Sequence, residues 1–276
     1  MTLLGATEIR ALAETLGVSP TKKWGQNFVH DANTVRKIVA TAALDPGEAV
    51  VEVGPGLGSL TLGLLEAGHP VTAIEIDPRL AERLPVTVAE HGVAEGMLTV
   101  VHADALAVTE LPSAPTALVA NLPYNVSVPV LIHLLETFPT IRRVLVMVQA
   151  EVGHRIAAVP GSKIYGVPSV KAAWWGSWAV EGTVSRRVFW PEPNVDSVLV
   201  GMTAHQSPGD ELLRRRVFTL ADAAFGQRRK TLRQALSSVT GGTDAAATLC
   251  ARAGIDSGAR GEQLTLADFV ALGTVV

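Results

Sequence analysis

Three short segments of the sequence combine residue types that could bind a nucleotide-like ligand. The first is a glycine-rich turn, residues 54–58 (GPGLG), directly after the apolar run 49–53. Glycine lets the backbone approach a ligand that a Cβ would keep away. The other two segments carry the carboxylates Glu75 and Asp104, each at the end of an apolar run of its own. A carboxylate about 20 residues after the glycines is where nucleotide-binding folds hold a pair of ribose hydroxyls.

The spacing of the glycines separates two classes of cofactor. A dinucleotide-binding turn has the spacing G-x-G-x-x-G, but here Ser59 stands where its third glycine would be. This favours a ligand without a pyrophosphate, such as S-adenosylmethionine, and the glycines alone leave a dinucleotide open. Two neighbouring acids have open roles. For Glu52 the alternatives are a contact to an amino group of the ligand, support of a neighbouring ligand contact, or an acid that simply ends a strand. For Asp104 they are a hydrogen bond accepted from adenine or a helix cap.

The segment Asn121-Leu122-Pro123-Tyr124 has the residue types needed to methylate an exocyclic amine. The N6 lone pair of adenine is delocalised into the ring, and two hydrogen-bond acceptors would turn it toward a sulfonium methyl. The side chain of Asn121 and the main-chain carbonyl of Leu122 are the candidate acceptors. Pro123 restricts the residue before it, and Tyr124 offers a stacking face worth roughly 1–3 kcal/mol to an unstacked base. A plain turn after a strand is the alternative interpretation.

Because transfer from a sulfonium is an in-line displacement, positioning does most of the work. We therefore expect no metal ion at this site.

Alternating apolar and amphipathic patterns must position these residues. Short apolar runs alternate with helical patterns, which predicts a parallel, doubly wound sheet with its ligands at the carboxyl ends of the strands. The predicted strands are 49–53, 71–76, 98–102, 117–120 and 144–148. The predicted helices are 6–17, 59–67, one that opens at Pro78, and 128–135.

The pattern changes after about residue 200, where Pro208-Gly209 is typical of a linker. Helical patterns follow at 212–225, 228–237, 244–253 and 264–272, without a strand pattern. We therefore expect an α/β domain over residues 1–205 and a small all-helical domain over residues 206–276.

Composition and charge favour a folded protein with a basic region. Apolar residues make up 48% and charged residues 18% of the 276 residues, which argues against disorder. The single cysteine excludes an internal disulfide and fits a reducing cytoplasm. Residues 142–233 hold 14 Lys and Arg against 7 Asp and Glu, although the net charge of the chain is −3. Both a face for a polyanion and ordinary solvated charge remain open.

Targeting signals and membrane spans are not expected. Residues 1–17 carry Glu8, Arg10 and Glu14 and lack the apolar core of a signal peptide. No apolar stretch approaches the ~20 residues that a membrane span requires. No isologous patch is evident either, so we expect a monomer.

The chain resembles the ribosomal RNA adenine dimethyltransferase family over nearly its whole length, and its bacterial small-subunit branch most of all. The resemblance rests on residues 23–29 (KWGQNFV), 51–58 (VEVGPGLG), 75–77 (EID), 104–106 (DAL), 121–124 (NLPY), 148–149 (VQ), 162–166 (SKIYG), 191–197 (PEPNVDS) and 225–232 (FGQRRKTL). Many methyltransferases share the glycine turn, whereas GQNF together with NLPY and QRRKT is far more specific.

The resemblance implies a fold, a cofactor and a substrate. The fold would be a Rossmann-like class I methyltransferase sheet with helices on both faces, and the cofactor S-adenosylmethionine. The enzyme would dimethylate the N6 amines of two adjacent adenosines in a stem-loop near the 3′ end of 16S rRNA. Its preferred substrate would be an immature small ribosomal subunit in the cytoplasm.

The resemblance also implies roles for individual residues. The residues expected to bind the cofactor are Asn27, Val29, Gly54, Gly56, Glu75, Asp104 and Asn121. Glu75 would hold the ribose hydroxyls, Asp104 the cofactor adenine, and Asn121 would lie between cofactor and substrate. Phe189 would face the target base opposite Tyr124, unless it is a core aromatic residue of a strand.

Basic residues are the candidate contacts to the phosphates of structured rRNA, which position an enzyme without reading sequence. These residues are Arg142, Arg143, Arg186, Arg187, Arg228, Arg229, Lys230 and Arg233. We expect residues 228–233 to lie on one helix and to present several cations within two turns.

The sequence also departs from the family pattern. Val29 stands where a leucine is expected, and Ala150 where a lysine usually follows Val-Gln. Trp174, Trp175 and Trp178 form an unusual aromatic cluster, which we interpret as core or interface packing rather than as a base-stacking surface.

Three other functions remain open from the sequence. A family member that modifies one adenosine of large-subunit rRNA is the nearest, but the segments at 161–166 and 225–232 favour the small-subunit branch. A non-catalytic nucleic-acid-binding module is a second, and the intact NLPY segment argues against it. A nicotinamide oxidoreductase is a third, but the chain lacks both the third glycine and a set of residues for hydride transfer.

Overall fold

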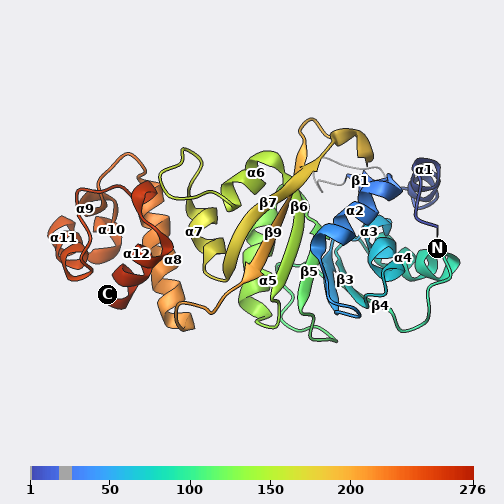
Figure 1. Cartoon of the computed structure of the whole chain (residues 1–276), viewed down its shortest axis with the longest axis horizontal. Coiled ribbons are helices and arrows are strands. Elements are labelled where there is room, and N and C mark those ends of the chain that lie inside the picture. Colours follow the sequence, from blue (N-terminus) through green and yellow to red (C-terminus); the bar gives the residue numbers. More distant parts are fainter. Residues whose placement is uncertain (1, 19–26) are drawn as a thin grey trace. The chain divides into compact units, whose positions relative to one another are not determined.

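The computed structural model describes residues 2–18 and 27–276 (Figure 1). Its contacts divide the chain into two compact units. The sheet unit comprises Met1–Gly153 and Ala179–Thr203, and the helical unit comprises His154–Trp178 and Ala204–Val276.

A seven-stranded mixed sheet has the strand order β4-β3-β2-β5-β6-β9-β7. Its parallel strands are β2 (Val50–Val53), β3 (Val71–Glu75), β4 (Leu98–His102), β5 (Ala117–Asn121) and β6 (Arg143–Gln149). These five strands confirm the five predicted from the apolar runs. The sheet continues through β9 (Ser197–Ala204), which pairs antiparallel with β6, to the edge strand β7 (Gly176–Val184). The sequence did not predict these two strands, because most residues of β7 face solvent and Gly201 interrupts the apolar run of β9.

Helices flank the sheet, as the α/β prediction required (Figure 1). They are α1 (Ala6–Thr15), α2 (Ala32–Ala42), α3 (Ser59–Glu66), α4 (Pro78–Glu90), α5 (Ser127–Thr137) and α6 (Ala150–Ile156). Local sequence sets their starts. The side chain of Asp31 accepts a hydrogen bond from Thr34 N at 2.6 Å at the start of α2, and Asp77 with Pro78 starts α4 in the same way.

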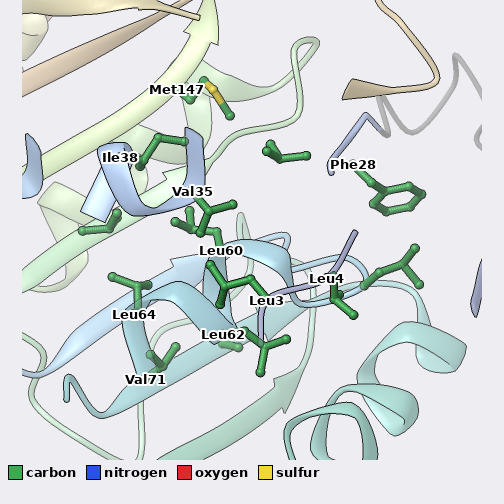
Figure 2. Close-up of a cluster of buried hydrophobic side chains, with 14 of the residues drawn as sticks. Leu3, Leu4, Phe28, Val35, Ile38, Leu60, Leu62, Leu64, Val71 and Met147 are labelled. Carbon is green, nitrogen blue, oxygen red and sulfur yellow. The ribbon is translucent and has the colours of Figure 1, made fainter. Parts of the chain in front are cut away.

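The hydrophobic core of the sheet unit supports the carboxyl ends of the central strands. Figure 2 shows Val35 and Ile38 of α2 beside Leu60 and Leu64 of α3. Gly63 allows this close approach of the two helices, because a Cβ on it would lie 2.4 Å from Val35 Cγ1. Each fully buried side chain of this kind contributes roughly 1.5–3 kcal/mol relative to an exposed one.

The helical unit is built from six helices within the described residues. They are α7 (Val167–Ala173), α8 (Glu211–Gly226), α9 (Leu232–Ala235), α10 (Ser237–Thr240), α11 (Thr243–Arg252) and α12 (Leu266–Thr274). The predictions of helices at 212–225, 244–253 and 264–272 are confirmed to within two residues at each end.

The predicted helix at 228–237 is wrong, and with it the expectation that residues 228–233 share one helical face. Residues 227–231 form a turn, and two short helices, α9 and α10, follow it. Hydrogen bonds to residues far away in the sequence replace the main-chain hydrogen bonds of the predicted helix. Arg228 donates to Glu262 Oε2 at 2.9 Å and to Lys163 O at 2.6 Å, and Leu232 N donates to Ala259 O at 2.8 Å.

The segment His154–Trp178 belongs to the helical unit, whereas the sequence analysis assigned it to the first domain. Its side chains make specific contacts with the C-terminal helices. Tyr165 donates to Leu264 O at 2.9 Å, and the rings of Trp174 and Trp175 pack edge-on against Phe218 at 6.2 and 5.7 Å between centroids. The interpretation of the tryptophan cluster as packing is therefore confirmed for these two residues, and Trp178 Nε1 donates to Ala172 O at 2.8 Å.

No helix in the described ranges has the length and apolar character needed to cross a bilayer.

Candidate active site

A cavity of about 260 Å³ lies at the carboxyl ends of the parallel strands of the sheet unit. All seven residues predicted to bind the cofactor line this cavity: Asn27, Val29, Gly54, Gly56, Glu75, Asp104 and Asn121. The parallel sheet explains the convergence, because the carboxyl ends of its strands share one edge. Residues separated by more than 90 positions in the sequence therefore contact one cavity, as Asn27 and Asn121 do.

The glycine turn between β2 and α3 forms one wall of the cavity. Gly54, Gly56 and Gly58 have φ values of 66°, 59° and 99°, a region that side-chain-bearing residues rarely adopt. A Cβ on Gly56 would lie 2.7 Å from Cε1 of Phe28, which itself lines the cavity. The turn thus needs glycine for its backbone conformation and for its packing.

Glu75 links the end of β3 to the glycine turn. Its side chain is 4% exposed, and its carboxylate accepts hydrogen bonds from Gly56 N at 3.1 Å, Ile76 N at 2.9 Å and Asp77 N at 3.0 Å. Burial raises the pKa of Glu75, and the three N–H groups oppose that shift. A carboxylate has about four acceptor positions. Glu75 can therefore still accept a hydrogen bond from a ligand hydroxyl.

Glu52 lies deeper, on β2, with 1% of its surface exposed. Burial raises its pKa to about 8, the nearby carboxylate of Glu75 adds to the shift, and the hydrogen bond from Thr61 Oγ1 at 2.6 Å opposes it. Near neutral pH this group is therefore mainly protonated in the protein without a ligand. Asp104, by contrast, is exposed and accepts a hydrogen bond from Leu106 N at 2.9 Å while also lining the cavity. Residues 105–107 form a turn and none of the described residues between β4 and β5 is helical, so the alternative of a helix cap at Asp104 is wrong.

Asn121, the last residue of β5, has a fixed amide orientation. Its Nδ2 donates to the main-chain oxygen of Asn27 at 3.0 Å. The amide oxygen makes no hydrogen bond to any residue in the described part of the chain, so it remains an acceptor at the cavity. Pro123 also lines the cavity, whereas the side chain of Leu122 is buried beside it.

Two aromatic residues predicted to contact the target base lie outside the cavity lining. Tyr124 is partly buried, and its hydroxyl lies 2.8 Å from Ser197 Oγ. Phe189 is 3% exposed and belongs to the hydrophobic core, on β8 (Phe189–Trp190), which pairs antiparallel with β1 (Phe28–Val29). This placement matches the alternative interpretation of Phe189 as a core aromatic residue.

Sequence reasoning missed several residues that line the cavity, among them Phe28, Ser59, Ile76 and Leu106. Ile76 and Leu106 are large apolar residues with 41% and 40% of their surface exposed. Each follows a strand-end carboxylate by one or two positions. An apolar residue directly after such an acid is the sequence signal that could have identified them.

The eight basic residues predicted to bind RNA fall into two groups. Four of them form intramolecular ion pairs: Arg143 with Asp45 and Glu48, Arg186 with Glu192, Arg228 with Glu262, and Arg233 with Asp244. The side chains of the other four make no hydrogen bond or ion pair to residues 2–18 or 27–276. These are Arg142, Arg187, Arg229 and Lys230, and all four are exposed.

Acidic, histidine and cysteine side chains do not gather at this cavity or elsewhere in the described residues in a group of three or more suited to a metal ion.

Comparisons with known proteins agree on one family. A family model described as ribosomal RNA adenine dimethylase matches residues 18–274. Ribosomal RNA small subunit methyltransferase A of Leifsonia xyli subsp. xyli is 68% identical over 272 residues, which cover 98% of this chain and 97% of that protein.

Solved structures show the same fold. A dimethyladenosine transferase from Plasmodium falciparum has a TM-score of 0.75 and 22% identity, covering 89% of this chain and 95% of that one. The 23S rRNA methyltransferase ErmE has a TM-score of 0.66 and 27% identity, covering 90% of this chain and 99% of that one. The predicted methyltransferase sheet is therefore confirmed.

Proposed function

Because the chain belongs to the ribosomal RNA adenine dimethylase family, we propose that it dimethylates the N6 amines of two adjacent adenosines in a stem-loop near the 3′ end of 16S rRNA. The substrate is an immature small ribosomal subunit, and the enzyme acts as a cytoplasmic monomer with S-adenosylmethionine as its cofactor. The observation that carries the proposal is the convergence of the seven predicted residues, Asn121 among them, on one cavity. The small-subunit substrate is supported by the relative that is 68% identical.

The cavity has the groups that this cofactor requires. Glu75, fixed by three main-chain N–H groups, keeps an acceptor position for a ribose hydroxyl. The apolar side chains of Ile76 and Leu106 contact the two faces of the adenine, and Asp104 accepts a hydrogen bond from its amine. When bound, the cofactor supplies a methyl group on an activated sulfonium.

Asn121 activates the target amine. Its amide oxygen and the main-chain carbonyl of Leu122 accept the two N–H hydrogens of adenine N6, which directs the nitrogen lone pair toward the methyl group. The hydrogen bond from Nδ2 to Asn27 O prevents the amide from turning its donor end toward the substrate. No covalent intermediate is needed, so the protein contributes mainly positioning.

The aromatic residues contribute at different distances from the base. Tyr124, whose hydroxyl is anchored on Ser197, provides the stacking surface for the unstacked adenosine. Phe189 lies in the core behind the cavity and supports Val29, its partner in the β1–β8 pair. A base contact by Phe189 would require its buried ring to move.

Exposed cations hold the rRNA. Arg142, Arg187, Arg229 and Lys230 are the principal phosphate contacts, because their side chains have no ion pair to break with any described residue. Arg143, Arg186, Arg228 and Arg233 must first exchange an existing carboxylate partner. Such contacts position the enzyme and make binding dependent on salt.

Methyl transfer to isolated ribosomal subunits tests this function. Tritiated S-adenosylmethionine is incubated with small subunits that lack the modification and, separately, with large subunits, and the labelled nucleosides are identified. We expect N6,N6-dimethyladenosine in small subunits only. Label in large subunits alone would favour a single-adenosine enzyme of the same family, and no label in either would favour a binding protein.

A further inference from the structure

The ion pair between Arg228 and Glu262 joins three separate segments of the helical unit. Arg228 lies in the turn at residues 227–231, and its Nε donates to Glu262 Oε2 at 2.9 Å. Its Nη2 donates to Lys163 O at 2.6 Å, in the segment that follows α6. The main chain links the other two segments, because Gly161 N donates to Glu262 O at 2.8 Å. One guanidinium group therefore holds the turn against segments that lie 34 and 65 positions away in the sequence.

The segment that carries Glu262 has further contacts that do not depend on its carboxylate. Leu232 N, just after the turn, donates to Ala259 O at 2.8 Å. Gly261 is buried against the end of α8, where a Cβ on it would lie 2.9 Å from Ala224 Cβ. The side chain of Glu262 can therefore be replaced without removing the main-chain contacts that support its own segment.

Exposed cations lie on the segments that this ion pair joins. Arg229 and Lys230 follow Arg228 in the turn, and both are exposed. Lys163, whose main-chain oxygen binds Arg228, is exposed as well. A carboxylate near these cations reduces their mutual repulsion, but it also repels the phosphates of RNA. The side chain of Glu262 is 31% exposed, so a carboxylate at this surface needs a role that outweighs the repulsion.

We propose that Glu262 and Arg228 are positioning residues for RNA binding. Their ion pair holds the turn so that its two exposed cations, together with Lys163, reach the phosphates of one RNA segment. Arg228 keeps its two partners when RNA binds, rather than exchanging them for a phosphate. This inference rests on the RNA-binding role proposed above for the exposed cations.

Two substitutions of Glu262 separate its position from its charge. Both Glu262→Ala and Glu262→Gln remove the negative charge, but the glutamine retains a carbonyl oxygen that can accept the hydrogen bond from Arg228. If only the charge matters, both variants bind small ribosomal subunits equally, and more tightly than the wild type. Binding is measured by titration with unmodified small subunits at several salt concentrations.

The positioning role predicts opposite results for these two variants. We expect Glu262→Ala to bind small subunits several-fold more weakly than the wild type, with a salt slope lower by about one because a phosphate contact is lost. We expect Glu262→Gln to bind at least as tightly as the wild type, since the hydrogen bond is kept and a repulsive charge is gone.

Asp244→Ala is the matched control. Asp244 pairs with Arg233 at 2.7 Å, a contact between α11 and α9, and its side chain is 92% exposed. Its removal frees a cation and deletes a negative charge, as Glu262→Ala does. We expect this variant to bind small subunits as tightly as the wild type or more tightly.

A double substitution tests whether the two residues act as a unit. Arg228→Ala with Glu262→Ala is expected to weaken binding no more than Glu262→Ala alone. S-adenosylhomocysteine affinity, measured as a check of the sheet unit, is expected to stay unchanged, because the residues that line the cavity belong to that unit.

Several outcomes would overturn the positioning role. Tighter binding by Glu262→Ala, or equal binding by the alanine and glutamine variants, would show that Glu262 acts through its charge alone. A further loss in the double variant would show that Arg228 contacts RNA itself. A wild type that did not bind small subunits would refute the RNA-binding role of the exposed cations, and this inference with it.

Discussion

The cofactor cavity and the basic residues assigned to RNA hold their functional groups in different ways. In the cavity, main-chain groups fix the side chains: three N–H groups hold Glu75, and a carbonyl oxygen holds Asn121. The basic residues are long and exposed, and half of them pair with carboxylates elsewhere in the chain. Geometry in the cavity therefore follows from the fold, whereas the basic residues must adapt their side chains when RNA binds.

The largest expected effect comes from removing the carboxylate that the main chain holds. Glu75→Ala leaves three N–H groups, one buried and two partly buried, without an acceptor and removes the ribose contact. We expect S-adenosylhomocysteine binding to weaken by roughly 100-fold or more, and the melting temperature to fall. Calorimetry and thermal unfolding check both effects. Asp77→Asn, which alters the neighbouring helix cap, is the control; if it weakened binding as much, the specific role of Glu75 would be refuted.

The second expected effect is a dependence of the free energy of unfolding on pH, caused by the buried carboxyl group of Glu52. The pKa of Glu52 is about 8 in the folded protein and near its usual value of 4.5 when unfolded. The folded state therefore binds the extra proton between these values, and stability falls as pH rises through this window. Thr61 and Glu75 are the polar groups that act on Glu52.

Glu52→Gln stays neutral and removes this dependence. Relative to this variant, the wild type is expected to lose up to about 1.4 kcal/mol of unfolding free energy per pH unit between pH 5 and 8. Above pH 8 the difference becomes constant. Denaturant unfolding at several pH values measures it, and parallel curves for the two proteins would show that Glu52 is not held protonated.

The third effect tests the division among the basic residues. Arg229→Ala with Lys230→Ala removes two unpaired cations, and is expected to weaken binding of small subunits and to lower the salt slope by about one for each lost contact. Arg233→Ala, which removes a residue paired with Asp244 at 2.7 Å, should change the slope less. Binding titrations at several salt concentrations compare them. If each substitution lowered the salt dependence of binding by the same amount, the paired and unpaired cations would not differ in their contribution to RNA binding.

The cavity could be predicted from the sequence because its determinants are local. Apolar runs identified the five parallel strands, and Glu75, Asp104 and Asn121 lie at or just after the ends of three of them. Asn27 and Val29 were predicted only from the family resemblance, since no apolar run indicated the short strand β1 (Phe28–Val29). The burial of the Ser59 hydroxyl and the high pKa of Glu52 escaped prediction, because burial depends on how the folded unit packs and not on the residue types alone.

The helical unit and the partners of the basic residues were harder to predict, because contacts between residues far apart in the sequence determine them. The pattern of residues 228–237 predicts one helix, but Arg228 bonds to Glu262 and Lys163 and residues 227–231 form a turn instead. The partner of Arg143, Asp45, lies 98 positions earlier in the chain. The residue type of Phe189 left both a base contact and a core position open, and its exposed fraction of 3% decides for the core. Long-range pairing, rather than local pattern, decides these cases.

The role of Asn121 is the central claim, and single-turnover methyl transfer by Asn121→Ala tests it most directly. Transfer to unmodified small subunits is measured at saturating cofactor, with S-adenosylhomocysteine affinity determined in parallel. We predict a rate at least about 100-fold below the wild type, with cofactor affinity reduced only several-fold, as for the loss of an interaction made in the transition state. A rate near that of the wild type would contradict the account, as would a loss fully explained by weaker cofactor binding.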